Sequence, residues 1–503
     1  MTTAVPARPS AGGRAAVAVL LLLGFYLIGL GIVAALVAAD FWLISRGRVP
    51  GRAIFFTGVI AFGILRGMFF VERRGEADEV TGVAVTDAEE PRLWATVREV
   101  AAALGTEPPA RLYLVPDVNA FVFQRSRFLG LVPGERVMGI GVPLLEVLTP
   151  DEMGGVLAHE FGHYTGGDTR LGPLVYRGRA SIGRTIHHLG DNLVAKVFEA
   201  YGNLYLRVSQ AVSRRQELAA DANAAHLVGA PAHASALRKV HVAGAAFDEF
   251  VERYAGPLWE AGRRPAALYE GFRLFHDHPD HEEGRASLAE RIAARETDRY
   301  DSHPSLGTRL AALGATDAPA PDDTARAVDL LADPARTDDR MSALVSRVAA
   351  RNGSLVPVAW DDEAAEAISA PFATSESERL HTAVAQVTGG TPGGIGGALA
   401  LVEEGRLADL ALAVEPRLAQ VADEEARQRI ARDVVTRALA GAVAAALTTA
   451  GGWRWSLRWN DSAALVSPKG VEWDFWAAAE EAVADPAKVA SLRRALKTRG
   501  IAV

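Results

Sequence analysis

The pattern of apolar and polar positions separates the first 75 residues from the rest of the chain. Residues 15–39 form 25 consecutive positions without a charge, rich in Leu, Val, Ala, Gly and Ile. About 20 apolar residues suffice for a helix to cross a bilayer, whereas a secretory signal has an apolar core of only about 7–15 residues. Residues 53–71 form a second apolar stretch, and its Arg66 lies close enough to the end to reach the headgroups. We therefore predict transmembrane helices at 15–39 and 53–71, with a buried or interfacial helix as the alternative for the second.

The region that follows combines short strand-like runs with longer helical segments. Residues 111–115, 121–123 and 136–142 favour strands, because turn elements that contain proline separate these short, β-branched or aromatic runs. We expect a small sheet from these runs and helices over most of the remaining chain. The predicted fold class is therefore mainly α with a small β-sheet (α+β).

Composition and charge exclude several classes of protein. The chain has 53 Lys and Arg against 61 Asp and Glu, a net charge of −8, and no cysteine. A nucleic-acid binder would show a basic excess, so nucleic acid is not an expected partner. Without cysteine there is no disulfide framework, no thiolate zinc site and no thiol catalysis, so any metal must be held by His, Asp and Glu.

The charges near the apolar stretches indicate an orientation. Residues 1–75 hold eight arginines and two acids, so this part carries +6 and the remainder −14. Four of these arginines lie before the first stretch or after the second, and three lie in the loop between the two stretches. Because positive charge accumulates on the cytoplasmic side, we predict a two-span protein of the cell membrane whose large acidic body is cytoplasmic.

One motif carries specific metal chemistry. Residues 149–152, Thr-Pro-Asp-Glu, predict a helix start with a capping box, and His159-Glu160-Phe161-Gly162-His163 follows on that helix. Residues four apart share one helix face, so His159 and His163 can bind one ion with Glu160 beside them. Imidazoles suit zinc, whose catalytic sites have three protein ligands and an open position. Glu160 would then act as the general base for a water molecule.

A third ligand is expected downstream. Glu217 and Asp221 lie one turn apart on a predicted helix, and therefore on one face. One of the two carboxylates can bind zinc while the other accepts the N–H of a ligand imidazole and fixes its tautomer.

Four segments together resemble the membrane-anchored zinc endopeptidases of metallopeptidase family 48, which include the HtpX heat-shock protease and the CAAX prenyl endopeptidase. The four segments, which occur in the family's order across residues 80–315, are Asn119-Ala120-Phe121, His159 to His163 with Asp168, Ser213 to Asp221, and His303-Pro304-Ser305 with Arg309. The resemblance implies a gluzincin-type domain with one zinc ion per subunit.

The resemblance also implies roles for individual residues. It makes Glu217 the third zinc ligand, with Asp221 and Asp168 behind the ligands. It places Asn119, Ala120 and Phe121 along the backbone of the substrate. It places His303 and Arg309 near the reacting carbonyl, where they would stabilise an oxyanion. A small sheet beside the zinc helix would offer an edge strand to which an extended peptide can add.

The chain departs from the family in one respect. Between His163 and Glu217 it has no further uncharged run of 20 residues, whereas the HtpX type carries additional spans there. Residues 171–188 are instead broken by three arginines. This favours a soluble catalytic domain on a two-helix anchor, with the Arg-rich segment as an interfacial helix, and it does not imply a prenylated substrate.

The favoured function is a membrane-bound zinc metalloendopeptidase with protein or peptide substrates and the lipid bilayer as partners. The alternative is a catalytically silent membrane adaptor with a structural metal and a partner-binding C-terminal domain. An intact Glu160 argues against the adaptor, because a structural site needs no base. The predicted domains are an anchor at 1–75, a zinc metallopeptidase domain at 76–316, an acidic Pro-rich linker at 317–323 and an α-rich C-terminal domain of unknown role and partner at 324–503.

The C-terminal half contains three further patterns. Residues 438–449 are apolar but too short to cross a membrane, so they predict a packed core helix. Trp and Arg alternate over residues 453–459 as in a half-buried strand, and a second strand ending near residue 473 would complete a hairpin. The His-rich residues 276–281 contain a proline and predict a solvated loop, with an accessory ion site as the alternative.

Overall fold

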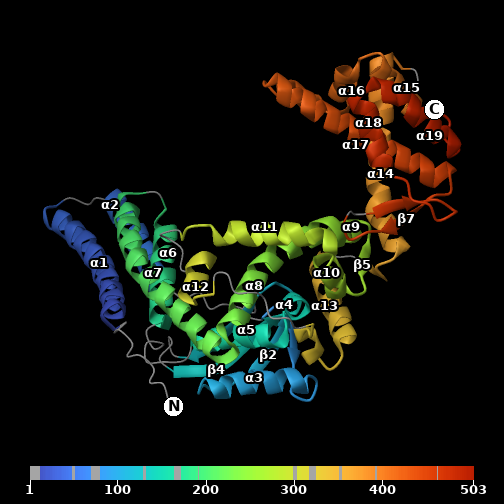
Figure 1. The fold of residues 1–503 in the computed structure, drawn as a ribbon. Helices are drawn as coiled ribbons and strands as arrows, with labels where there is room; N and C mark the ends of the chain where they lie inside the picture. Colours follow the sequence, from blue (N-terminus) through green and yellow to red (C-terminus); the bar gives the residue numbers. More distant parts are fainter. Residues whose placement is uncertain are drawn as a thin grey trace. The chain divides into compact units, whose positions relative to one another are not determined.

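The computed structural model describes residues 12–47, 51–69, 80–127, 132–163, 172–190, 192–297, 303–315, 324–349, 354–390, 393–460 and 463–503. The chain is mainly helical with small sheets, which confirms the predicted fold class (Figure 1). It divides into two compact units, one of Met1–Gly244 and Arg285–Ala332 and one of Ala245–Gly284 and Asp333–Val503. The predicted linker at 317–323 lies outside the described residues, and the predicted domain limits remain predictions.

Four helices of the first unit form a bundle: α1 (Gly12–Ser45), α2 (Gly51–Phe69), α6 (Gly172–Leu189) and α7 (Leu193–Val228). Figure 1 shows them side by side. Their shared apolar core includes Leu22, Phe25, Ile64, Met68, Ile182, Phe198 and Tyr205. Helices α2 and α6 approach so closely that a Cβ at Gly67 would collide with Thr185. The Arg-rich segment is therefore mostly α6, and it packs against both predicted spans.

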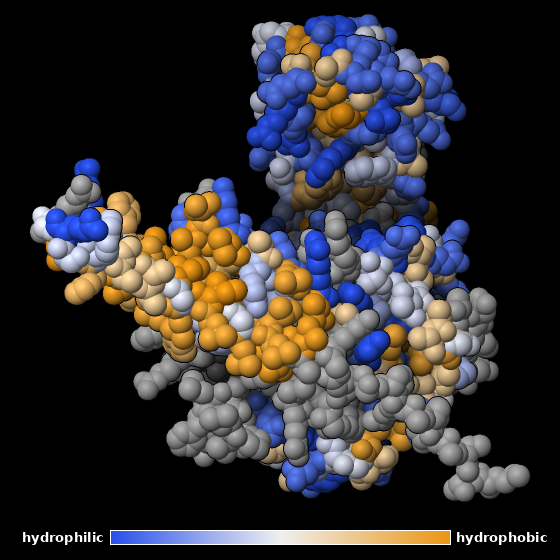
Figure 2. Space-filling view, turned by 90° about the vertical axis from the view of Figure 1, so that its left-hand side faces the viewer, coloured by the Kyte–Doolittle hydropathy of each residue, from blue (hydrophilic) through white to orange (hydrophobic). Residues whose placement is uncertain are grey.

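The outer surface of this bundle is apolar. Helix α1 contains a stretch of 27 residues, Val19–Ser45, that is long and apolar enough to cross a membrane. The apolar part of α2 among the described residues, Ile54–Phe69, is shorter, and the last two residues of the predicted second span lie outside them. Figure 2 shows the apolar face, whose exposed side chains include Leu20, Leu23, Leu27, Phe41, Trp42, Phe55, Phe56 and Phe62. Such a surface marks an interaction with a membrane or another apolar partner. The second span remains a prediction.

A four-stranded sheet in the order β1-β2-β4-β3 completes the first unit. The strands are β1 (Val83–Val85), β2 (Arg111–Val115), β3 (Ala120–Arg127) and β4 (Val132–Gly141). The sheet confirms the three predicted strands. Within this sheet, strands β2 and β4 are parallel and the other two pairs are antiparallel. In β2 the alternate residues Leu112 and Leu114 are buried, so one face of the sheet is covered, whereas in the central strand β4 the consecutive residues from Val137 to Ile140 are all buried. Strand β3 forms one edge, and no described strand pairs with its outer side.

The other helices of the first unit surround the sheet and the bundle. They are α3 (Pro91–Ala103), α4 (Val142–Val147), α5 (Pro150–Gly162), α8 (Ala230–Phe250), α11 (Glu282–Ala293), α12 (Leu306–Ala312) and the short η6 (Ala327–Leu330). Helices α8 and α11 contribute residues to both units.

The second unit is an α-rich body with two small two-stranded sheets. Its elements are η4 (Val251–Ala255), α9 (Gly256–Glu260), β5 (Arg263–Pro265), α10 (Leu268–His276), η5 (Pro279–His281), α13 (Pro334–Ala349), β6 (Val356–Val358), α14 (Asp362–Thr388), α15 (Gly394–Glu403), α16 (Leu407–Val414), η7 (Pro416–Gln420), α17 (Glu424–Ala450), β7 (Arg454–Leu457), β8 (Ala463–Val466), α18 (Phe475–Ala484), η8 (Pro486–Lys488) and α19 (Val489–Thr498).

Two predictions for the second unit can be compared with this structure. The apolar residues 438–449 lie in α17, where Leu439 and Val443 are fully buried, so the predicted core helix is confirmed. The predicted hairpin is β7 and β8. Strand β8 ends at Val466, earlier than predicted, because a turn follows in which the N–H of Gly470 donates to the carbonyl of Ser467 at 2.9 Å.

Candidate metal centre

The helix that carries His159 and His163 is α5, and its start is held firmly. The Thr149 side chain accepts from the backbone N–H of Glu152 at 3.2 Å, and the Glu152 carboxylate accepts from the N–H of Thr149 at 2.8 Å, which confirms the predicted capping box. Glu152 is buried and also accepts hydrogen bonds from Ser235 at 2.6 Å and Lys239 at 2.8 Å, both on α8. The Glu152 carboxylate therefore caps the start of α5 and also ties α5 to α8.

Helix α7 brings the carboxylates to the histidines. It packs directly on α5, and a Cβ at Gly162 would lie only 3.0 Å from the Cα of Ala220. A side chain at position 162 would push the two helices apart. The glycine between the two histidines thus sets the distance from His163 to the carboxylates of α7.

Three predicted ligands converge at this contact. Ligand atoms of His159, His163 and Glu217 all lie within 4.8 Å of one another. Nε2 of His159 lies 3.4 Å from Oε2 of Glu217, and Nε2 of His163 lies 3.7 Å from Oε1. Oε2 of Glu217 is buried and has no hydrogen-bond partner among the described residues. A buried carboxylate oxygen facing two imidazoles is a donor set that suits a zinc ion.

Asp221 accepts hydrogen bonds behind the histidines. Its Oδ1 lies 2.9 Å from Nδ1 of His159, and Arg309 donates to both of its oxygens at 2.6 and 2.8 Å. A proton on Nδ1 of His159 leaves the lone pair of Nε2 facing Glu217, as a metal ligand requires. The arrangement places Asp221 behind a ligand histidine and places the Arg309 guanidinium on Asp221.

His233 completes this group and was missed from the sequence. It lies on α8, is fully buried, and its Nε2 is 3.0 Å from Oδ1 of Asp221. His159, Asp221 and His233 also form a cluster of ligand atoms. Because Arg309 occupies both oxygens of Asp221, this second cluster is less suited to a metal than the first. No other ligating residue stands three or four positions from His233 in the sequence, so no motif pointed to it.

Nearby positive and polar groups lower the pKa of both carboxylates. Burial alone would raise the pKa of Glu217, but the nearby imidazoles of His159 and His303 hold it well below its ordinary value. Burial also opposes ionisation of Asp221, and the bonds from Arg309 outweigh it, so that pKa too is strongly lowered. Both carboxylates therefore stay ionised. Arg309 pairs with the charge of Asp221, and the charge of Glu217 faces the imidazoles and can attract a cation.

The two histidines respond in opposite directions. Burial disfavours the charged ring of His159, yet its interactions with Asp221 and Glu217 prevail and raise its pKa to about 9. Burial and the neighbouring His159 lower the pKa of His163 to about 4. A bound cation would have to displace the proton on the His159 nitrogen that faces Glu217.

Glu160 lies between the helix and the edge strand. Burial is the main reason that the pKa of Glu160 is raised to about 7, and a backbone hydrogen bond from Val122 of β3 works against that rise. The residue next to the first histidine therefore contacts the strand that the sequence placed along the substrate. A carboxylate with a pKa near neutrality suits a general base.

Three of the remaining predicted residues belong to the start of this strand or directly precede it, and His303 lies beside Glu217. Asn119 and Ala120 stand at the start of β3, where the N–H of Gly141 donates to the carbonyl of Asn119 at 2.7 Å. The Phe121 ring stacks on Phe123 with ring centres 5.9 Å apart. Nδ1 of His303 is 3.1 Å from Oε1 of Glu217, although 63% of its side chain is exposed. Asp168 lies outside the described residues.

The His-rich segment 276–281 belongs to the second unit. Nε2 of His281 is 2.6 Å from the carbonyl oxygen of Trp459. Among the described residues, the clusters that could hold a metal do not include this segment.

Comparisons with known proteins agree with the geometry. Residues 87–317 match the sequence model of the family described as Peptidase family M48. A "Protease HtpX homolog" from Tropheryma whipplei (strain Twist) is 28% identical over 265 residues, which is 48% of this chain and 88% of that protein. No solved structure matches the chain significantly.

Two further relatives with the same name have a higher identity over shorter stretches. The one from Burkholderia multivorans is 30% identical over 242 residues, or 42% of this chain and 76% of that protein. The one from Neisseria meningitidis (strain FAM18) is 31% identical over 218 residues, or 39% of this chain and 75% of that protein. This similarity covers most of each relative, and so the chain belongs to peptidase family M48.

Proposed function

We propose that this chain is a membrane-anchored zinc metalloendopeptidase that hydrolyses peptide bonds of protein substrates. The observation that carries the proposal is the convergence of His159, His163 and Glu217 from two packed helices, with Glu160 beside them against an edge strand. These three side chains would hold one zinc ion per subunit, which supplies Lewis acidity that polarises the scissile carbonyl and makes a water molecule easier to deprotonate.

Glu160 provides the proton transfers. Its raised pKa, about 7, lets the carboxylate take a proton from the attacking water near neutral pH. The same carboxyl group then returns the proton to the nitrogen of the leaving amine. The backbone of Val122 holds the carboxylate against β3, so an extended peptide paired with the edge of β3 would present its carbonyl beside Glu160.

Asp221 and Arg309 act as positioning residues. Asp221 accepts a hydrogen bond from the protonated Nδ1 of His159, and this leaves Nε2 free to bind the metal. Arg309 keeps Asp221 ionised through its two hydrogen bonds. Arg309 thus acts on the reaction through Asp221, while His303, at the exposed side of Glu217, is the residue that can reach the oxyanion of the substrate.

The anchor consists of α1 and α2 as two spans, with the metal centre on the cytoplasmic side. The exposed apolar side chains of both helices and the arginine distribution support this arrangement. Asn119, Ala120 and Phe121 line the path of the substrate backbone. The role and partner of residues 324–503 are left open by the proposal.

The test is cleavage of an unfolded model protein by the wild type and by Glu160→Gln, with bound zinc measured in both. Glu160→Gln should retain near-wild-type zinc and lose activity by at least about 10², the scale expected when a general base is removed. Unreduced activity in Glu160→Gln would contradict the mechanism. A wild type that binds zinc but cleaves nothing would favour the silent adaptor.

A further inference from the structure

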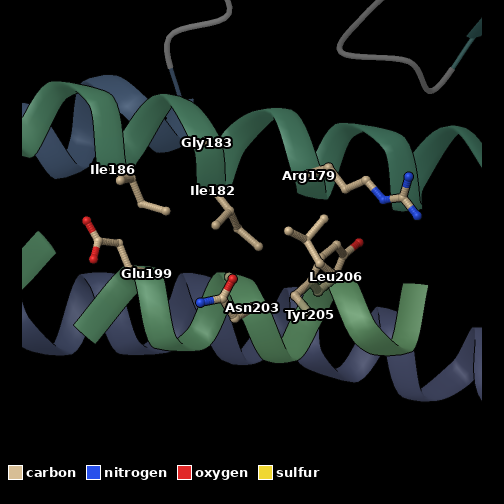
Figure 3. Close-up of a pocket in the computed structure, with 9 residues that line it drawn as sticks. Arg179, Ile182, Gly183, Ile186, Glu199, Asn203, Tyr205 and Leu206 are labelled. Atoms are coloured by element: carbon tan, nitrogen blue, oxygen red, sulfur yellow. The ribbon is translucent and has the colours of Figure 1, made fainter. Parts of the chain in front are cut away.

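A groove of about 300 Å³ lies between α6 and α7. Figure 3 shows Ile182 and Ile186 pointing from α6 toward α7, where Asn203 lies between Glu199 and Leu206. Arg179 extends toward one end of the groove and Glu199 lies at the other. The lining is mostly apolar, with Asn203 in the middle of one wall and charged side chains at the ends. A mostly apolar lining with a few polar groups is the usual composition of a ligand site.

The groove shares a helix face with the metal centre. Leu206 and Glu217 are eleven positions apart on α7, so they differ by only about 20° around the helix axis. Their separation along the axis is about 16 Å at the usual rise. An extended polypeptide covers that distance with about five residues. Ser209 and Gln210, which lie between the two on α7, are buried. A polypeptide whose peptide bond lies at the metal centre would therefore reach the groove by passing over Arg179, which donates to Ser209 and Ser213.

Arg179 lies at the end of the groove nearer to Glu217. Its guanidinium donates to the hydroxyls of Ser209 and Ser213, both at 3.1 Å, and among the described residues it pairs with no carboxylate. Arginine has five N–H donors in all. Its remaining donors can bind carbonyl oxygens of an extended backbone that runs from the groove toward Glu217.

The groove also lies beside α1. A Cβ at Gly178, next to Arg179, would lie 3.0 Å from a methyl group of Leu22, and the Tyr201 hydroxyl donates to the carbonyl of Leu21 at 2.5 Å. These residues stand near the start of the apolar stretch of α1, which begins at Val19. A polypeptide segment in the groove would thus run between the anchor and the metal centre.

We propose that the α6–α7 groove is a substrate exosite that binds one large aliphatic side chain about five residues from the scissile bond. The inference rests on the proposed function. The ligand is an extended polypeptide with Leu, Ile or Val at that distance. The exosite would select among peptide bonds that the metal centre alone treats alike.

Gly183 allows a sharp test, because it lines the groove and a Cβ there would meet no atom within 4 Å. Gly183→Leu would fill the groove with a side chain and leave the helix intact. The matched control is Gly244→Leu on α8, a helical glycine with equally open surroundings. Leu206→Ser is a second variant, which makes the wall polar.

The probes are two fluorogenic 20-residue peptides with the same central sequence, one with Leu and one with Ser five residues on either side of the scissile bond. For full-length protein in detergent, the ratio of kcat/KM between the Leu and Ser peptides is the readout, because it cancels differences in active enzyme. We expect a ratio of about 10 in the wild type and Gly244→Leu, the scale of one apolar side chain in a pocket, and a ratio near 1 in Gly183→Leu and Leu206→Ser.

A wild-type ratio near 1, or a ratio that stays near 10 in both groove variants, would overturn the exosite. A six-residue peptide with the same central sequence is too short to reach the groove. If the wild type cleaves it while the ratio is 1, the exosite fails and the proposed function stands. If the wild type cleaves none of the peptides, the proposed function fails and the exosite with it.

Discussion

Asp221 in the metal centre and Asp338 on α13 of the second unit are both almost fully buried, with 1% and 4% of each residue exposed. Asp221 accepts from a guanidinium and two imidazoles, and its pKa is strongly lowered. Among the described residues, the donors to Asp338 are neutral, and they include the backbone N–H groups of Tyr269 and Glu270 and the hydroxyl of Ser342.

The outcome for the two carboxylates differs accordingly. Burial raises the pKa of Asp338 to about 6, although its hydrogen bonds oppose the rise. Asp338 caps the first turn of α10 from another helix, which is a structural role. The comparison teaches that burial alone does not identify a functional carboxylate. A carboxylate kept ionised by a cation, next to histidines that can bind metal, does.

Of the variants considered for these carboxylates, Arg309→Ala should lower the unfolding free energy most. It leaves Asp221 buried without its cation, and breaking a buried ion pair in this way costs about 3–5 kcal/mol of unfolding free energy. Denaturant unfolding of the zinc-loaded protein measures the loss. Arg238→Ala is the control, because Arg238 donates to the neutral carbonyl of Ala315, and loss of this hydrogen bond should cost about 1 kcal/mol. A similar small loss in Arg309→Ala would mean that Asp221 does not depend on this cation.

Asp338 should make the second unit less stable as the pH rises. Because its pKa is raised in the folded protein, its stabilising contribution is full below about pH 4 and is lost as the pH rises through about 6. The shift corresponds to about 3 kcal/mol if Asp338 acts alone. Urea unfolding between pH 4 and 7 should show this slope in the wild type and a flatter one in Asp338→Asn.

The control for this pH effect is Asp339→Asn, since the neighbouring Asp339 is 60% exposed and pairs with Arg264 at the surface. Asp339→Asn should keep the wild-type slope. Equal slopes in the wild type and Asp338→Asn would show that Asp338 does not titrate differently in the folded and unfolded chain.

Thr149→Ala should have the smallest effect. It removes the side-chain cap from α5 and costs about 1 kcal/mol, the usual value of a helix cap. Glu152 keeps its bonds to Ser235 and Lys239, so this buried carboxylate stays compensated. Thermal unfolding can compare it with Thr96→Ala, which should change little because the Thr96 hydroxyl donates to the carbonyl of Arg92 on its own helix at an exposed position. A loss above about 3 kcal/mol would show that Glu152 depends on the cap.

Local patterns were enough to predict α5, its cap and the strands β2, β3 and β4, because caps, ligand spacing and strand composition act over a few residues. Chain-distant contacts were not predictable. His233 reaches Asp221 from α8 without any motif of its own. The place of α6 in the bundle depends on the close approach of Gly67 to Thr185, which hydropathy does not reveal, so three arginines suggested an interfacial helix instead.

The central claim is that Glu217 binds the metal and Asp221 supports a metal-binding histidine, and zinc retention tests it most directly. Glu217→Ala removes one of three protein ligands, so zinc should be largely lost under mild chelation. Asp221→Asn keeps an acceptor for His159 without the charge, so zinc should remain with affinity weakened by about 10–100-fold, and excess zinc should restore part of the activity only in this variant. The reverse order of zinc retention would make Asp221 the ligand. Full retention in both variants would place the third ligand elsewhere and contradict the account.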